Sequence, residues 1–160
     1  MAEKLIEIRG YKEKDAPQIV RLFYDTIHSI NRSDYSDEQV AAWAPEIPDA
    51  SAWHHRMASR KTLVAAENDE VVGFAELEED GHLDMFYLRK DAVGRGIAKH
   101  LYRALEGEAL SLGVGRIFTE ASITARPFFN KQGFRVVREQ TVQRLGVSLT
   151  NFVMEKSLGS

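Results

Sequence analysis

Hydrophobic and polar residues alternate at the start of the chain, where Ile6 and Ile8 stand between charged neighbours. This period of two predicts a strand over residues 4–10. Apolar residues then recur every three or four positions as far as Ile30, which predicts a helix with Asp15 as its cap. Further strands are predicted at 62–67, 71–79, 82–90, 116–122 and twice within 133–156, and further helices in pieces of 31–57, at 97–112 and at 124–132.

This order of elements predicts a mixed α/β fold whose first half is antiparallel, because a short turn joins the strands at 62–67 and 71–79. No low-complexity linker or internal repeat divides the sequence. With 160 residues, 44% of them hydrophobic, the chain is long enough for a sizeable core. We therefore expect one domain over residues 1–160.

Charge and composition exclude several classes of protein. A net charge of -3 argues against a broad nucleic-acid surface. The chain has no cysteine, which rules out a disulfide framework, a thiol nucleophile and a Cys-type zinc site. It also has no signal-peptide pattern and no apolar run as long as a membrane span. We expect a cytoplasmic protein with no nucleic-acid or membrane partner, as a monomer or homodimer.

Two glycines flank an arginine between the strand at 82–90 and the helix at 97–112. A helix N-terminus carries unpaired N–H groups and positive partial charge, and glycine lets a phosphate approach the backbone. The segment lacks the Lys-Ser/Thr pair of a P-loop. A Rossmann turn would need glycine at Lys99, although Glu120 ends the next strand where a ribose-binding acid would lie. A turn alone, a Rossmann domain and another phosphate site stay open at this point.

The segment Val93-Gly94-Arg95-Gly96-Ile97-Ala98 resembles the acetyl-CoA-binding loop of the GNAT superfamily of N-acetyltransferases, whose pattern is Gln/Arg-x-x-Gly-x-Gly/Ala. Val93 departs from that pattern at its first position. Residues 122–134, "SITARPFFNKQGF", are similar to a second segment of the family. Ser122 stands there for asparagine and Phe129 for tyrosine, and the spacing of the two segments matches the family.

The resemblance implies a central, mostly antiparallel sheet of about seven strands with about four flanking helices, splayed between the fourth and fifth strands. It implies acetyl-CoA as co-substrate, with its pantetheine arm in the gap, and no metal. The Leu88 N–H group would stabilise the oxyanion. The cofactor-binding residues that it implies are Phe86, Tyr87, Leu88, Val93, Gly94, Arg95, Gly96, Ile97, Ala98, Ser122, Phe128, Phe129 and Lys131.

Three residues are candidates for the general base. His82 and Asp84 lie two apart on one predicted strand, so both side chains point to the same face. Imidazole has a reference pKa near 6.5, which suits a base at neutral pH. Glu120 on the next strand is the third candidate. The alternatives are a strand-end histidine, a hidden salt bridge for Asp84, and groups that merely order water.

Phe129 occupies the position where many family members carry a general-acid tyrosine, and a phenyl ring has no proton to give. Tyr87 or Tyr35 would be the substitute. For the acceptor, Tyr35, Trp43 and His28 are the candidate binding residues, in a region dense in aromatic and imidazole groups. The alternative is that Trp43, Trp53 and His28 only pack within the fold.

The function expected from these residues is transfer of an acetyl group from acetyl-CoA to the primary amine of a small molecule, by direct attack in a ternary complex. The alternative is a non-catalytic acyl-CoA-binding module, which Phe129 favours. A Rossmann-type nucleotide-binding domain is the third reading.

Overall fold

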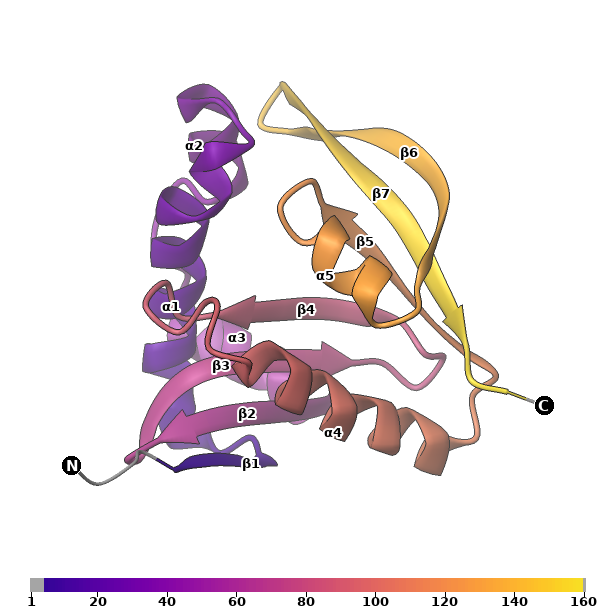
Figure 1. Ribbon diagram of the computed structural model, residues 1–160. Coiled ribbons are helices and arrows are strands. Elements are labelled where there is room, and N and C mark those ends of the chain that lie inside the picture. Colours follow the sequence, from indigo (N-terminus) through magenta and orange to yellow (C-terminus); the bar gives the residue numbers. More distant parts are fainter. Residues whose placement is uncertain (1–4, 160) are drawn as a thin grey trace.

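The computed structural model describes residues 5–159, which form two antiparallel sheets (Figure 1). The first sheet has the order β1-β2-β3-β4 and consists of β1 (Ile6–Gly10), β2 (Lys61–Glu67), β3 (Glu70–Leu77) and β4 (Leu83–Leu88). The second has the order β5-β7-β6 and consists of β5 (Arg116–Ser122), β6 (Arg135–Arg144) and β7 (Val147–Ser157). The sheets meet at one isolated parallel bridge, from His82 to Phe118. The predicted splay between the fourth and fifth strands is therefore confirmed.

Five α-helices flank the two sheets over residues 5–159. These are α1 (Ala16–Ser29), α2 (Asp37–Trp43), α3 (Ala50–Ala58), α4 (Ile97–Leu112) and α5 (Arg126–Lys131), with short 3-10 turns at Glu13–Asp15 and Asn31–Ser33. α1 and α3 pack on one face of the first sheet and α4 on the other. The described chain has five α-helices rather than about four, because Pro45 and Pro48 separate α2 from α3. No helix among residues 5–159 is long and apolar enough to cross a membrane.

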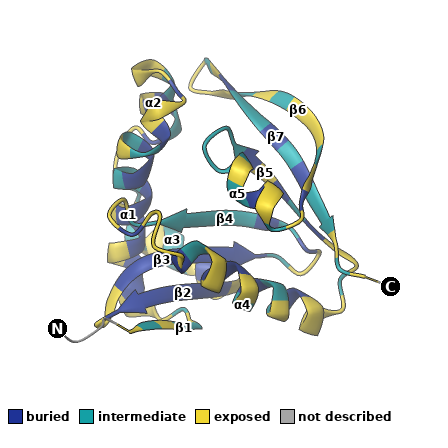
Figure 2. Cartoon of the chain, viewed as in Figure 1, coloured by how far each residue is buried: buried dark blue, intermediate teal, exposed yellow. Residues whose placement is uncertain are grey.

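The buried residues form two main clusters, one on each face of the first sheet. Figure 2 shows the central strands β2 and β3 of this sheet in the colour of buried residues. Ile19 and Ile27 of α1 pack against Phe74 in the first cluster. In the second, Leu101 and Leu105 of α4 lie on one helical face. Strands β2 and β3 are buried almost throughout because helices cover both of their faces. Truncating a buried leucine such as Leu101 to alanine costs about 2–5 kcal/mol of unfolding free energy.

Asp15 precedes α1 as expected, but its carboxylate caps no N–H group of that helix. It instead forms two hydrogen bonds with the Arg9 guanidinium, at 2.8 and 2.9 Å, and accepts another from the Lys12 N–H. Arg9 lies on β1, so the carboxylate fixes the start of α1 against the sheet edge.

One glycine decides where β4 begins. Gly81 has a φ of +96°, and a Cβ there would lie 2.2 Å from the Arg116 carbonyl oxygen. The Phe118 N–H group donates to the Gly81 carbonyl at 3.1 Å. This close approach holds the residue that follows, His82, beside β5.

Candidate active site

A cleft of about 490 Å³ lies where the two sheets separate. Its walls come from α1, α2, β4, the loop before α4, β5, α5 and the β6–β7 hairpin. Of the candidate site residues, those that line it are Tyr35, Trp43, Asp84, Phe86, Tyr87, Leu88, Val93, Gly94, Ala98, Glu120, Ser122, Phe128 and Phe129. Thus most of the site residues predicted from the sequence, which come from five separate segments of the chain, line one cavity.

β4 presents an unpaired edge to this cleft. The Arg89 N–H group donates to the Val72 carbonyl at 2.7 Å, and Leu88 is in register with Gly73. Because bonded and non-bonded pairs alternate in an antiparallel ladder, the N–H and C=O groups of Leu88 point away from β3. The Leu88 carbonyl accepts from Thr26 Oγ1 of α1 at 2.6 Å. This geometry leaves the Leu88 N–H group directed toward the gap between the sheets.

The loop before α4 has the open backbone that phosphate binding requires. Gly94 and Gly96 have φ values of +83° and +81°, and a Cβ on either would meet no atom within 4 Å. Gly96 is the N-cap of α4. The loop therefore offers a helix N-terminus free of side-chain cover.

Four residues expected near the cofactor do not line the cleft: Gly96, the N-cap of α4, and three residues whose side chains lie elsewhere. The Arg95 guanidinium pairs with the buried carboxylate of Glu67 at 2.5 Å. Ile97 is buried in the core beside Ala65 and Val72. Lys131 is exposed at the end of α5. The backbone of the loop, rather than these side chains, is the part available to a phosphate.

The α5 segment supplies a closed aromatic wall. Phe129 is 2% exposed and packs against Phe86, Phe128 and Phe134. Its ring offers no proton donor at the position of the family's tyrosine. Ser122 accepts from the Ala125 N–H group at 3.0 Å, which ties β5 to the start of α5.

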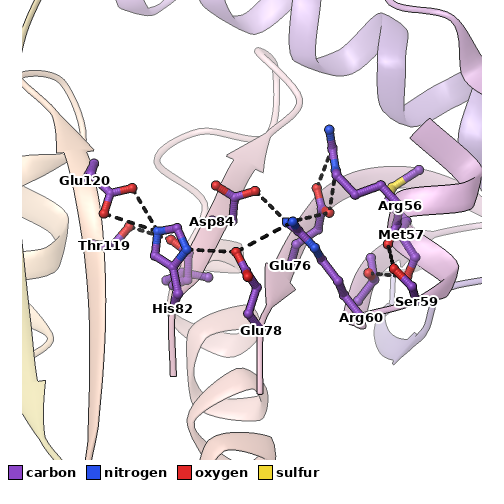
Figure 3. Close-up of polar contacts among 12 residues, drawn as sticks. Arg56, Met57, Ser59, Arg60, Glu76, Glu78, His82, Asp84, Thr119 and Glu120 are labelled. Atoms are coloured by element: carbon purple, nitrogen blue, oxygen red, sulfur yellow. Dashed lines mark hydrogen bonds and ion pairs between the residues drawn. The ribbon is translucent and has the colours of Figure 1, made fainter. Parts of the chain in front are cut away.

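His82 lies between two carboxylates, as Figure 3 shows. Its Nδ1 is 2.8 Å from Glu78 Oε1, and its Nε2 is 2.8 and 3.2 Å from the two oxygens of Glu120. The hydrogen bond with Glu120, opposed by burial and reinforced by Glu78 and the charge of Asp84, raises the pKa of His82 to about 9. The expectation of an imidazole titrating near 6.5 is thus corrected, since His82 is a cation at neutral pH.

Asp84 takes part in a second group of charges on the same side of β4 (Figure 3). Arg60 Nη1 lies 2.6 Å from Asp84 Oδ2, and the same guanidinium is 3.6 Å from Glu78 and 3.7 Å from Glu76. Arg56 pairs with both oxygens of Glu76, at 2.8 and 3.0 Å. The salt bridge considered as an alternative for Asp84 is therefore present, and Asp84 lines the cleft as well.

The cluster of Glu78, His82 and Asp84 has ligand-type atoms within 4.8 Å of one another. Arg60 pairs with one oxygen of Asp84, and both ring nitrogens of His82 bond to carboxylates. Because these atoms already have partners, we interpret the cluster as an ion-pair network.

Of the candidate residues for binding the acceptor, some line the cleft and others do not. Tyr35 and Trp43 line the cleft and contact each other edge to face, with ring centroids 5.2 Å apart. Trp53 packs in the core against Phe23. His28 lies outside the cleft lining, because its Nε2 bonds the Ala44 carbonyl at 2.6 Å and so joins α1 to the end of α2.

Sequence reasoning missed part of the site. Phe23 and Thr26 line the cleft from α1, where the helical pattern marked their face as core. Arg144 and Asn151 line it from the β6–β7 hairpin, a stretch without any motif. Arg60 gave no local signal, since its partner Asp84 is 24 residues away.

The chain was compared with known proteins. Residues 31–156 match the family model described as "Acetyltransferase (GNAT) domain".

The chain belongs to the GNAT acetyltransferase family.

Its relatives agree with this membership. The chain is 34% identical to the uncharacterized N-acetyltransferase YafP of Escherichia coli, over 93% of this chain and 94% of YafP. It is similar to the structure of a GCN5-related N-acetyltransferase from Rhodopseudomonas palustris, with a TM-score of 0.91, 35% identity and 99% of each chain covered. PaiA N-acetyltransferase from Thermoplasma acidophilum, solved with coenzyme A, has a TM-score of 0.79 at 21% identity, over 96% of this chain and 99% of PaiA.

Family membership decides between the readings of the glycine loop. The antiparallel sheets of this GNAT acetyltransferase exclude the parallel sheet that a Rossmann domain requires. Acetyl-CoA is the co-substrate that the family implies, and the open loop before α4 fits its pyrophosphate.

Proposed function

We propose that this GNAT acetyltransferase transfers an acetyl group from acetyl-CoA to the primary amine of a small molecule, by direct attack in a ternary complex. One observation carries the proposal. A single cleft joins the glycine loop, the open edge of β4 and two carboxylates, those of Asp84 and Glu120. Cofactor and amine therefore reach the same space from its two ends.

Glu120 is the proposed proton acceptor. It lines the cleft and is 37% exposed, so an incoming amine reaches it. His82 is protonated at neutral pH and holds the Glu120 carboxylate in place through their hydrogen bonds. His82 thus acts as a positioning residue for this carboxylate rather than as the base itself.

The charges around Glu120 favour a cationic acceptor. With His82 protonated, the network holds three cations and four carboxylates, namely Arg56, Arg60 and His82 with Glu76, Glu78, Asp84 and Glu120. One negative charge remains uncompensated, which attracts an ammonium group. Loss of the ammonium proton to Glu120, directly or through water, frees the nitrogen lone pair for attack.

Two further groups support the transfer. The Leu88 N–H group points into the gap and is the proposed oxyanion donor. Tyr87 is the proposed donor of a proton to the leaving thiolate. Burial raises the pKa of Tyr87 and outweighs the opposing effect of Trp43, so the phenol keeps its proton at neutral pH. By contrast, Tyr35 donates its proton to the Thr150 carbonyl at 2.6 Å.

Direct attack is proposed because the cleft, as formed by residues 5–159, offers no cysteine or free serine that acetyl-CoA would acetylate first to form an acetyl-enzyme intermediate. It contains no cysteine, and the hydroxyl oxygen of Ser122 already accepts from Ala125. Initial rates with both substrates varied should give intersecting double-reciprocal lines. Parallel lines would contradict the ternary complex.

The test is release of CoA thiol from acetyl-CoA in the presence of a panel of small primary amines. Glu120→Gln should lower kcat/KM about 100-fold or more, in the range for loss of a general base. Its Kd for CoA should stay within a few-fold of the wild-type value. Glu139→Gln is the matched control, because Glu139 is exposed on β6 and does not line the cleft.

Two outcomes would contradict the proposal. Full turnover by Glu120→Gln would exclude Glu120 as the base. Binding of acetyl-CoA without acetylation of any amine would instead support the alternative of a non-catalytic acyl-CoA-binding module.

A further inference from the structure

The cleft is charged asymmetrically. Its charged lining residues are Asp84, Glu120 and Arg144. Arg60 pairs with Asp84 and His82 pairs with Glu120. Over residues 5–159, no carboxylate lies within 4.0 Å of the Arg144 guanidinium, which donates to the Gln143 carbonyl at 2.9 Å. A cation that lines a binding cleft without an acidic partner is available to an anionic group of a ligand.

Strand register gives the separation between the two ends. Glu120 of β5 is in register with Val153 of β7, and Arg144 of β6 is in register with Val147. Six residues of β7 separate these two rows, which is about 20 Å at roughly 3.3 Å per residue. The exposed side chain of Arg144 leans along the strand and reaches part of the way toward Glu120, whose carboxylate is held at His82.

The region between the two ends is mostly apolar. Val142 and Leu149 face the cleft from the hairpin, opposite Phe23 and Trp43 of the helices. Asn151 lies between the two rows, and its Oδ1 is buried without a hydrogen-bond partner.

We propose that the acceptor is an ω-amino carboxylate, a linear molecule with a primary amine at one end and a carboxylate at the other, joined by an apolar chain of several carbons. The amine lies at Glu120 and the carboxylate at Arg144, with the apolar chain against Val142 and Leu149. This inference rests on the proposed function, since it assigns the acceptor class of that site. An α-amino acid is too short, because one carbon joins its two charged groups.

The experiment compares ω-aminooctanoate with octylamine, which has the same chain without the carboxylate. The wild type should acetylate ω-aminooctanoate with a kcat/KM at least about tenfold higher, the low end for a charge-assisted bidentate contact. Arg144→Gln should abolish this preference through a higher KM, and Arg144→Lys should retain part of it. Because Arg144 is exposed, neither substitution disturbs the core.

Arg138→Gln is the matched control. Arg138 is an exposed arginine of the same strand, but it lines a second hollow rather than this cleft. It lies across β7 from Glu120, in the Val153 row, within reach of a shorter molecule. The preference for ω-aminooctanoate should persist in this variant.

The outcomes separate this inference from the proposed function. Acetylation of octylamine and ω-aminooctanoate at equal rates would overturn the inference alone. So would a preference for γ-aminobutyrate that Arg138→Gln removes, since the anion would then bind in the second hollow. Acetylation of no amine would overturn both. Calorimetric titration of ω-aminooctanoate into the CoA-bound protein checks binding separately, and Arg144→Gln should weaken it about tenfold or more.

Discussion

His82 shows how two contacts change the chemistry of one side chain. In an unfolded chain its imidazole has the reference pKa near 6.5, while Glu120 and Glu78 raise the pKa to about 9 in the folded protein. The sequence indicated where His82 lies, because alternation places it on the face of Asp84. It did not indicate the protonation state, since Glu120 is 38 residues away in the chain.

The raised pKa makes stability depend on pH. Protonated His82 stabilises the fold fully below pH 6.5, and this contribution is lost as pH rises through about 9. Both partner carboxylates are about one-third exposed, so solvent screening limits the contribution to on the order of 1–2 kcal/mol. His82→Gln should therefore be less stable than the wild type at pH 6 and equally stable above pH 9.5.

Urea unfolding at several pH values measures this difference. His55→Gln is the control, because His55 is exposed on α3. A stability difference that stays constant from pH 6 to pH 10 would show that His82 acts through packing on Phe118 alone.

At the scale of elements, the sequence predicted nearly every boundary correctly because local signals fix them. Gly113 ends α4 in the left-handed conformation, and Asn68 and Asp69 adopt positive φ in the β2–β3 turn. The cleft wall formed by the β6–β7 hairpin was not predicted. Its side chains carry no motif, and their neighbours on α2 come from a distant part of the chain.

The loop that begins α4 allows a test with two glycines of one element. Gly96→Ala should lower the free energy of unfolding by roughly 1–2 kcal/mol, because alanine is strained at a φ of +81°. It should also weaken CoA binding, since a methyl group then stands at the pyrophosphate loop. Urea unfolding and calorimetric CoA titration measure the two effects.

Gly107→Ala is the matched control within the same helix. Gly107 is exposed in the middle of α4, and a Cβ there meets no atom within 4 Å. Alanine should raise the free energy of unfolding by about 0.5–1 kcal/mol and leave CoA affinity unchanged. Wild-type CoA affinity in Gly96→Ala would show that the loop does not hold the pyrophosphate.

At the scale of the whole molecule, the separation of the sheets determines where the site forms. Family resemblance predicted the splay, whereas alternation of residues along each strand carries no information about which strands pair. The ion-pair network that runs from α3 through β3 and β4 to β5 was also not predictable from the sequence. Its pairs join residues that are distant in the chain, such as Arg56 of α3 with Glu76 of β3, and His82 with Glu120 of β5.

Thermal unfolding tests ligand binding to the intact protein. Acetyl-CoA and CoA at ~100 times their Kd should each add about 2.7 kcal/mol of stability and raise Tm by roughly 5–10 °C. NAD and ATP at the same concentration should leave Tm unchanged. A shift with NAD alone would contradict acetyl-CoA as the co-substrate.

The open edge of β4 has a consequence for the protein without its cofactor. The Leu88 N–H group points away from β3, and an extended chain can add to a sheet by bonding to such an unpaired N–H group. A pantetheine arm lying in the gap would take the place of a neighbouring strand and cover this edge. Without acetyl-CoA, the exposed edge of β4 is open to pairing with other chains. We therefore expect a low acetyl-CoA concentration to promote aggregation of the protein as well as to slow its turnover.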